Sequence, residues 1–130
     1  MENNQPDERW CLNLDWYREN GCSIYFLAKD YLCAKCQKKL KKEVEAEVVI
    51  KTVSGCCARK DDFFTPNAPV LACIFQVFLA NGNKPLSLEE LGKALADHRD
   101  AAALPASVLG RLLKSDRYYG FHAIRPQKSD

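Results

Sequence analysis

The sequence predicts a mainly α-helical protein with a minimal β element, built from two parts that form one compact unit. Three observations predict this fold class. Apolar residues recur at helical spacing in several windows, and the clearest alternating stretch is short and lies near the end of the chain. Six of the seven cysteines precede residue 60. We therefore expect a cysteine-rich part over residues 1–62 and a regular helical part over residues 63–130.

Composition excludes several classes of protein. The 130 residues are 47% hydrophobic and carry a net charge of +2, which alone does not indicate a nucleic-acid binder. The longest apolar run, residues 68–82, is too short to span a membrane and contains Gln76. No export signal is apparent, so we expect a soluble cytoplasmic protein without membrane contact. No nucleophile, phosphate loop or metalloprotease motif is present, and we do not expect an enzyme.

The first part contains three expected helices. Residues 14–21 predict a short helix with Asp15 as its N-cap, and Ser23 is placed to cap the next one. Residues 40–53 fit two patterns: apolar residues four apart suit a helix, whereas alternation with glutamate suits a strand. The start, rich in lysine and glutamate, favours a helix that ends at Gly55.

The second part has the clearer pattern. A helix begins after Pro69 and is apolar on all sides, so we expect it to be the buried centre of the protein. Ser87 and Glu90 have the spacing of a capping box, which opens a second helix. A third helix over about 105–114 and a strand over 118–124 complete the part.

This order of elements, over residues 68–125, resembles a winged helix-turn-helix. The resemblance implies that the third helix enters the major groove of DNA. Carried over by position, it implies DNA contacts from Ser107, Arg111, Lys114 and Arg117. A winged helix usually ends in a hairpin of two strands, but only six residues follow Ile124. We therefore expect the second wing strand to be missing or vestigial.

The cysteines predict a metal site. Cys33 and Cys36 have the two-residue spacing of a zinc half-site, and a second pair is expected about 15 to 20 residues later. Cys56 and Cys57 follow after 19 residues, but they are adjacent, and adjacent side chains diverge on a helix or strand. Both can bind one ion only from a distorted turn, which Gly55 would permit.

Two questions about this site remain open from the sequence. If only one of the adjacent cysteines binds the ion, Cys22 or Cys11 completes the set. Zinc is the preferred metal, and an iron–sulfur cluster is the alternative. The CxxC pair, the CC pair and the helical half together also resemble small uncharacterised bacterial proteins, which implies no function.

We therefore expect a zinc-stapled N-terminal segment joined to a reduced winged helix, which binds DNA and regulates transcription. An adaptor that uses the winged helix for docking a partner protein or for homodimerisation is the alternative. An iron–sulfur redox sensor is the second alternative.

Five lysines lie close together in the sequence after the first cysteine pair: Lys35, Lys38, Lys39, Lys41 and Lys42. The preferred interpretation is a solvated face that the glutamates of residues 43–47 balance. The alternative is a phosphate-binding patch beside the metal site. We expect such a patch to be functional only if it lies on the same side as Arg111 and Lys114.

Overall fold

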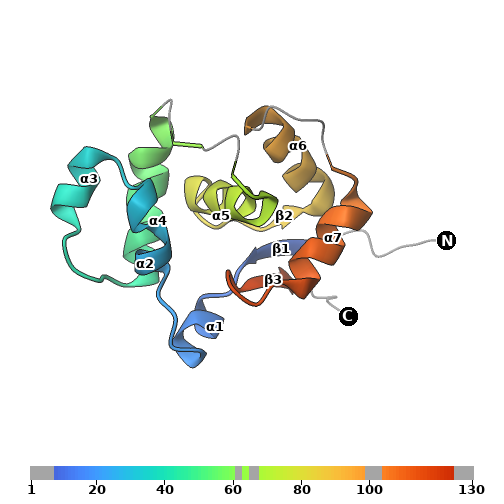
Figure 1. The fold of residues 1–130 in the computed structure, drawn as a ribbon, viewed down its shortest axis with the longest axis horizontal. Coiled ribbons are helices and arrows are strands. Elements are labelled where there is room, and N and C mark those ends of the chain that lie inside the picture. The colour runs from blue at the N-terminus through green and yellow to red at the C-terminus, as the bar shows by residue number, and fades with distance from the viewer. Residues whose placement is uncertain (1–7, 61–62, 65–67, 99–103, 125–130) are drawn as a thin grey trace, which may run out of the picture.

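The computed structural model describes residues 8–60, 63–64, 68–98 and 104–124 (Figure 1). Its elements, in order, are β1 (Arg9–Leu12), α1 (Leu14–Glu19), α2 (Ile24–Ala28), α3 (Ala34–Lys39), α4 (Ala46–Gly55), α5 (Val70–Ala80), β2 (Leu86–Ser87), α6 (Leu88–His98), α7 (Ala106–Ser115) and β3 (Phe121–Ile124). Single 3₁₀ turns, η1 (Lys29–Tyr31) and η2 (Cys57–Arg59), follow α2 and α4. The mainly helical fold class with a minimal β element is confirmed.

The caps of the first two helices depend on short polar side chains. The N-cap of α1 is Asn13, whose Oδ1 accepts a hydrogen bond from the Trp16 N–H at 3.2 Å, so the prediction of Asp15 was wrong. Asp15 lies in the first turn, where its carboxylate pairs with Arg18. The predicted cap of α2 is confirmed, because Ser23 Oγ accepts from the Phe26 N–H.

The ambiguous segment forms a helix, as preferred, but α4 begins only at Ala46. Val49 and Val53, four residues apart, are fully buried, and Ile50 lies beside them. These residues face the core, where α4 contacts α2 and α5. Packing of one apolar stripe therefore decides the structure of a segment whose local pattern allowed two.

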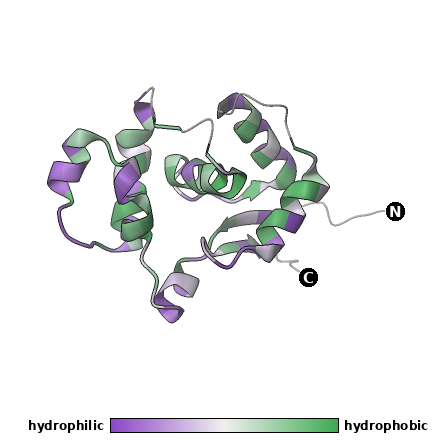
Figure 2. Ribbon diagram, viewed as in Figure 1, coloured by the Kyte–Doolittle hydropathy of each residue, from purple (hydrophilic) through white to green (hydrophobic). Residues whose placement is uncertain are grey.

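Helix α5 is the centre of the protein, as its composition predicts. Every residue from 72 to 79 is buried, including Gln76, and the helix contacts α4, α6 and β1. Figure 2 shows that most of α5 is coloured apolar and that the helix lies between the two groups of helices. Gln76 Nε2 donates a hydrogen bond to the carbonyl of Phe63, so this buried amide ties α5 to the segment after η2.

The β element is a three-stranded antiparallel sheet of order β2-β1-β3. The middle strand comes from the N-terminus, which the sequence pattern did not predict to be a strand. Trp10 pairs with Leu86 on one side and with Ala123 on the other. The first predicted part of the chain therefore supplies the strand that joins both strands of the second.

The capping box of α6 is confirmed. The Glu90 N–H donates to Ser87 Oγ at 3.1 Å, and the Ser87 N–H donates to Glu90 Oε1 at 2.9 Å. Arg9 of β1 also reaches this carboxylate, at 2.8 Å. Helices α6 and α7 then pack against each other, with Leu91, Leu109 and Leu113 buried. Within the described part of the chain, no helix is long and apolar enough to cross a membrane.

Candidate metal centre

Four cysteines meet where the start of α3 lies against the end of α4. Cys33 is the N-cap residue of α3, and Cys36 lies in its first turn. Cys56 is the residue that ends α4, and Cys57 begins η2. Each half of the cluster therefore comes from a helix terminus, where the backbone changes direction and can point neighbouring side chains to one side.

The sulfur atoms are close enough to share one ion. The Sγ atoms of Cys33, Cys36 and Cys57 all lie within 4.8 Å of one another. Cys33 Sγ lies 3.6 Å from Cys57 Sγ and 3.8 Å from Cys56 Sγ, and all four residues are free thiols. Cys33, Cys36 and Cys57 could therefore hold a metal ion, and Cys56 lies at their edge.

Both adjacent cysteines reach Cys33 because the backbone leaves helical geometry at Cys56. Cys56 has φ −139° and ψ −68°, which is neither helical nor extended. The distorted turn that the sequence required is thus present, although it falls on Cys56 and not on Gly55, which is the last residue of α4. Regular helix or strand geometry at this position would turn the two thiols apart.

The environment of the thiols favours a bound cation. The backbone amide of Cys36 is the main influence that lowers the pKa of Cys33, to about 6, and the neighbouring thiols add to it. Burial raises the pKa of both Cys36 and Cys57. The Cys33 N–H also points at Cys57 Sγ, at 3.2 Å. A metal ion would offset the cost of burying several thiolates together, because it supplies the missing positive charge.

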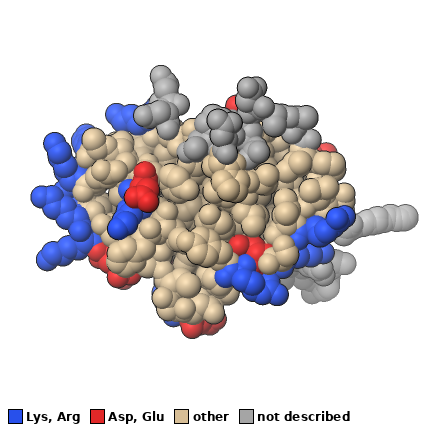
Figure 3. All heavy atoms as spheres, in the orientation of Figure 1, with Lys and Arg blue, Asp and Glu red and all other residues tan. Residues whose placement is uncertain are grey.

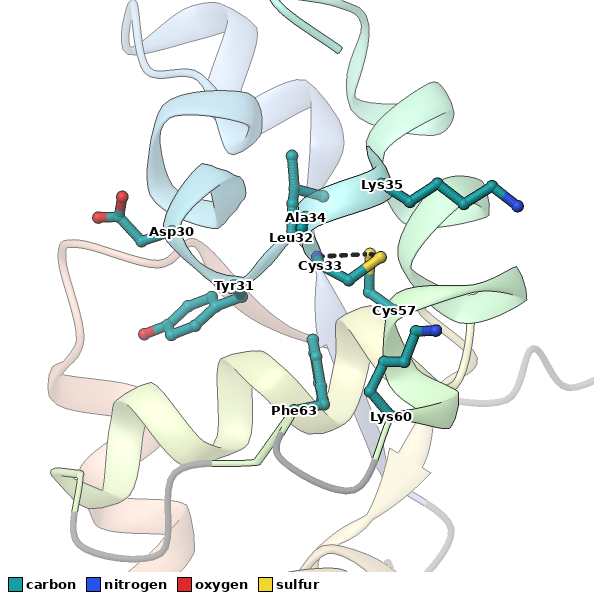
Figure 4. A pocket seen from close by; sticks show the side chains of 9 residues that line it. All are labelled: Asp30, Tyr31, Leu32, Cys33, Ala34, Lys35, Cys57, Lys60 and Phe63. Carbon is teal, nitrogen blue, oxygen red and sulfur yellow. Dashed lines mark hydrogen bonds between the residues drawn. The ribbon is translucent and has the colours of Figure 1, made fainter. Parts of the chain in front are cut away.

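One side of the cluster opens to solvent. Cys36 and Cys57 are buried, whereas Cys33 and Cys56 are half-buried. A pocket of about 450 Å³ adjoins them, with Lys35 and Lys60 among its lining residues. Figure 4 shows both lysines extending to the same side of the pocket, past the sulfurs of Cys33 and Cys57.

The remaining cysteines do not belong to this cluster. Cys11 is buried in β1 opposite His122, and Cys22 is exposed after α1. Cys73 is buried in α5 and donates to the carbonyl of Ala68. Of the residues that the structure describes, none of these three joins the group that could hold an ion. Neither Cys22 nor Cys11, the two alternatives for completing the ligand set, therefore lies in the cluster.

The predicted DNA-contacting residues lie together at the other end of the molecule. Ser107, Arg111 and Lys114 are exposed on α7, and Arg117 is exposed just after it. Arg117 Nη1 donates to the carbonyls of Lys114 and Asp116, at 3.3 and 3.0 Å. A groove of about 400 Å³ runs along this helix and is lined by Ser107, Arg111, Lys114, Gly110, Leu88 and others.

The lysine cluster of α3 does not share this side. Helices α3 and α7 lie at opposite ends of the fold, and basic side chains gather separately at each end (Figures 1 and 3). Sequence reasoning missed that Lys60 lies near Lys35 of α3, because the two residues are far apart along the chain. Cys57 could have revealed this proximity, because its contact with Cys33 brings η2 beside the start of α3.

No protein-family model, curated protein or solved structure matches this chain. The site must therefore be interpreted from its own geometry. That geometry defines a cysteine cluster suited to a metal ion, placed at one end of a mainly helical protein.

Proposed function

We propose that the protein is a metal-stabilised DNA-binding protein that regulates transcription, with α7 in the major groove. The observation that carries the proposal is the exposed face of α7. Ser107, Arg111 and Lys114 follow one another at intervals of four and three residues, so they share one side of the helix. Leu109 and Leu113 anchor the opposite side in the core. Such a firmly held helix with a basic outer face suits insertion into a groove.

The order of elements supports the same proposal. Helix α5, strand β2, helices α6 and α7, and strand β3 follow one another as the winged-helix resemblance implies. The second wing strand was expected to be missing, and residues 125–130 lie outside the described part of the chain. Strand β1 takes its place as the antiparallel partner of β3. The sheet thereby supports the C-terminal end of α7, which contacts β3.

Zinc is the metal that we propose for the cysteine cluster, with Cys33, Cys36, Cys56 and Cys57 as ligands. A tetrahedral site with Zn–S bonds of about 2.3 Å places its sulfurs about 3.8 Å apart. The observed separations of 3.6 and 3.8 Å from Cys33 agree with this edge length. An iron–sulfur cluster fits less well, because several iron and sulfide atoms must lie between the thiolates. Bound zinc would be structural and would join α3 to the end of α4.

Metal analysis is the first experiment. Protein purified without oxygen should contain about one zinc per chain and absorb no visible light, as a closed four-thiolate zinc site does. Iron with acid-labile sulfide would replace this proposal by the redox sensor. Folded protein that contains no metal after this purification would refute the metal site.

The DNA-binding proposal is tested by fluorescence anisotropy with a random-sequence 20-bp duplex. Affinity should fall steeply between 50 and 200 mM salt, since cations that contact phosphates release counterions. Arg111→Ala combined with Lys114→Ala should lower the affinity at least about tenfold and flatten the salt dependence. Lys51→Ala with Lys84→Ala is the matched control, because both lysines are exposed on other elements.

A protein-docking role for the same end of the molecule is the alternative. It is favoured by a second groove of about 470 Å³ beside α7, whose lining includes Trp10, Trp16 and Phe121. Docking or homodimerisation through apolar surface should tolerate salt and survive the loss of Arg111 and Lys114. Light scattering that shows a salt-insensitive dimer, with no DNA binding, would favour this role.

A further inference from the structure

The surface of α3 is strongly basic. Lys38 and Lys39 lie three and four residues after Lys35, so the three lysines share one face of α3. Lys41 and Lys42 follow after Leu40. All five are exposed, and no ion pair joins them to an acidic residue in the described ranges. Of the three glutamates that were expected to balance them, Glu47 pairs with Arg18 at 3.3 Å, while Glu43 and Glu45 are exposed after Lys42. The five lysines therefore outnumber the three neighbouring glutamates, and none of these lysines forms an ion pair in the part of the chain that the structure describes.

The metal centre enlarges this surface. Cys57 begins η2, and its sulfur contacts both Sγ and the backbone N–H of Cys33, 24 residues earlier. Arg59 and Lys60, which come soon after Cys57, are exposed, and Lys60 lies in the same pocket lining as Lys35 of α3. Lys35 and Lys60 line one pocket and extend to the same side of it (Figure 4). We call the exposed lysines of residues 35–42, with Lys60, the α3–η2 surface.

The chemistry of this surface fits a phosphate backbone. Lysines are compact, mobile point charges that suit sequence-independent contacts with phosphates. A membrane surface is a poorer fit, because binding to it needs apolar side chains that insert beside the cations. The large exposed apolar residues in the described part of the chain are Phe26, Val48, Tyr118 and Ile124, and none lies on α3 or η2.

The position of the surface matters as much as its charge. It lies at the end of the molecule opposite α7, so it is separate from the basic face of that helix (Figures 1 and 3). From the sequence, the lysines are expected to be functional only on the same side as Arg111 and Lys114. That expectation assumed that all of these residues contact one DNA duplex. Two basic surfaces at opposite ends can instead bind independently.

We propose that the α3–η2 surface is a second nucleic-acid-binding surface, which holds the backbone of double-stranded DNA without reading its sequence. One chain can then bridge two duplexes, with α7 on one and the α3–η2 surface on the other. The bridging rests on the proposed function of α7, whereas backbone binding by the α3–η2 surface does not.

The first test measures binding of a random-sequence 20-bp duplex to full-length protein carrying Arg111→Ala and Lys114→Ala. Binding should persist in 50 mM salt. Adding Lys38→Gln and Lys39→Gln should weaken it at least about tenfold and reduce the slope of log affinity against log salt by about 1.8, since each phosphate contact contributes about 0.9. These lysines are chosen because they are not adjacent to a cysteine. Lys84→Gln with Lys93→Gln, an equal change of charge at other exposed sites, should have little effect.

The second test measures bridging. Bead-bound duplex should capture a second, fluorescent duplex through the wild-type protein. The Lys38/Lys39 variant and the Arg111/Lys114 variant should each still bind one duplex but lose at least about nine-tenths of the capture, because bridging needs both surfaces.

The outcomes separate the two proposals. Unchanged affinity and salt slope when Lys38→Gln and Lys39→Gln are added to the Arg111/Lys114 variant would overturn the α3–η2 surface. So would lysine-dependent binding to anionic phosphatidylserine vesicles without binding to duplex. Duplex binding that needs Lys38 and Lys39 but ignores Arg111 and Lys114 would support the α3–η2 surface and refute only the role of α7.

Discussion

Asn83 and Leu12 exchange two hydrogen bonds across the core. The Leu12 N–H donates to Asn83 Oδ1 at 2.8 Å, and Asn83 Nδ2 donates back to the Leu12 carbonyl at 3.0 Å. Asn83 has a φ of +62°, a left-handed conformation that asparagine adopts more readily than most residues. Its carboxamide therefore pairs with the last residue of β1 as a neighbouring strand would, and it joins the turn after α5 to the N-terminal strand.

We expect Asn83→Asp to destabilise the protein by about 1 to 3 kcal/mol, because a carboxylate cannot donate to the Leu12 carbonyl and repels it. Urea unfolding at pH 7 measures the change in free energy of unfolding. Asn81→Asp is the control, since Asn81 makes a similar pair of hydrogen bonds with Lys84 in an exposed turn. Equal losses at the two positions would contradict a special role for Asn83.

Replacement of the buried thiol of Cys36 by serine should remove most of the bound metal. The same change at exposed Cys22 should leave metal content and melting temperature unchanged. The reason is that the metal supplies folding free energy for α3 and the end of α4, which have little apolar core of their own. Elemental analysis and thermal unfolding, run on both variants, check this. Full zinc content in Cys36→Ser would contradict the ligand assignment.

Cys56→Ser tests whether the fourth thiol is a ligand. Cys56 is half-buried and its sulfur lies 3.8 Å from that of Cys33, so we expect it to complete the tetrahedron. The variant should retain zinc at three thiolates but bind it at least about 100-fold more weakly, more than the usual effect of an outer-sphere change. Competition with a chromogenic chelator measures the affinity. An affinity equal to wild type would show that only three cysteines bind.

Gly120 lies directly against the ring of Trp16. A Cβ at this position would lie 2.6 Å from Trp16 Cε3, and Gly120 has a φ of +66°. We therefore expect Gly120→Ala to cost about 2 to 4 kcal/mol, the sum of a strained backbone and a displaced ring. Gly21→Ala is a matched control, since Gly21 has a φ of +65° with open space around it. The difference between the two variants isolates the contact with Trp16, and equal losses would refute it.

The capping box should contribute to stability in a pH-dependent way. The backbone N–H of Ser87, with smaller help from Arg9, lowers the pKa of Glu90 below its ordinary value near 4.5. A lowered folded-state pKa means that the contribution is complete above the unfolded value and is lost as the pH falls through the folded value. Because the side chain is 48% exposed, we expect only about 0.5 kcal/mol after solvent screening.

Comparison of Glu90→Gln with wild type in urea, at pH 7 and at pH 3, measures this contribution. The variant should be less stable than wild type at pH 7 and nearly equal to it at pH 3. Glu89→Gln, at the adjacent exposed position, should show no such convergence. A constant difference between Glu90→Gln and wild type would exclude an ionic contribution.

Several features of the fold were predictable from local sequence. The apolar composition of α5 identified the buried centre, and the spacing of Ser87 and Glu90 identified the start of α6. The spacing of Cys33, Cys36 and Cys57 identified residues that do meet. In each case the physical cause acts over a few residues or one helical face, so it leaves a pattern in the sequence.

Other features depend on contacts between segments far apart in the chain. Strand β1 is too short to have a clear period, and it is a strand only because β2 and β3 supply its hydrogen bonds. The turn at Cys56 follows from the way α4 ends against α3.

The sequence by itself determined most of the helices, although not α3, together with the cysteine pairs and the number of basic residues. Only the tertiary structure decided that the cations of α3 and α7 occupy opposite ends and that η2 joins the first of them. The physical reason is that charge and helical period are local properties, whereas the direction in which a surface faces depends on how the buried α5 packs its neighbours.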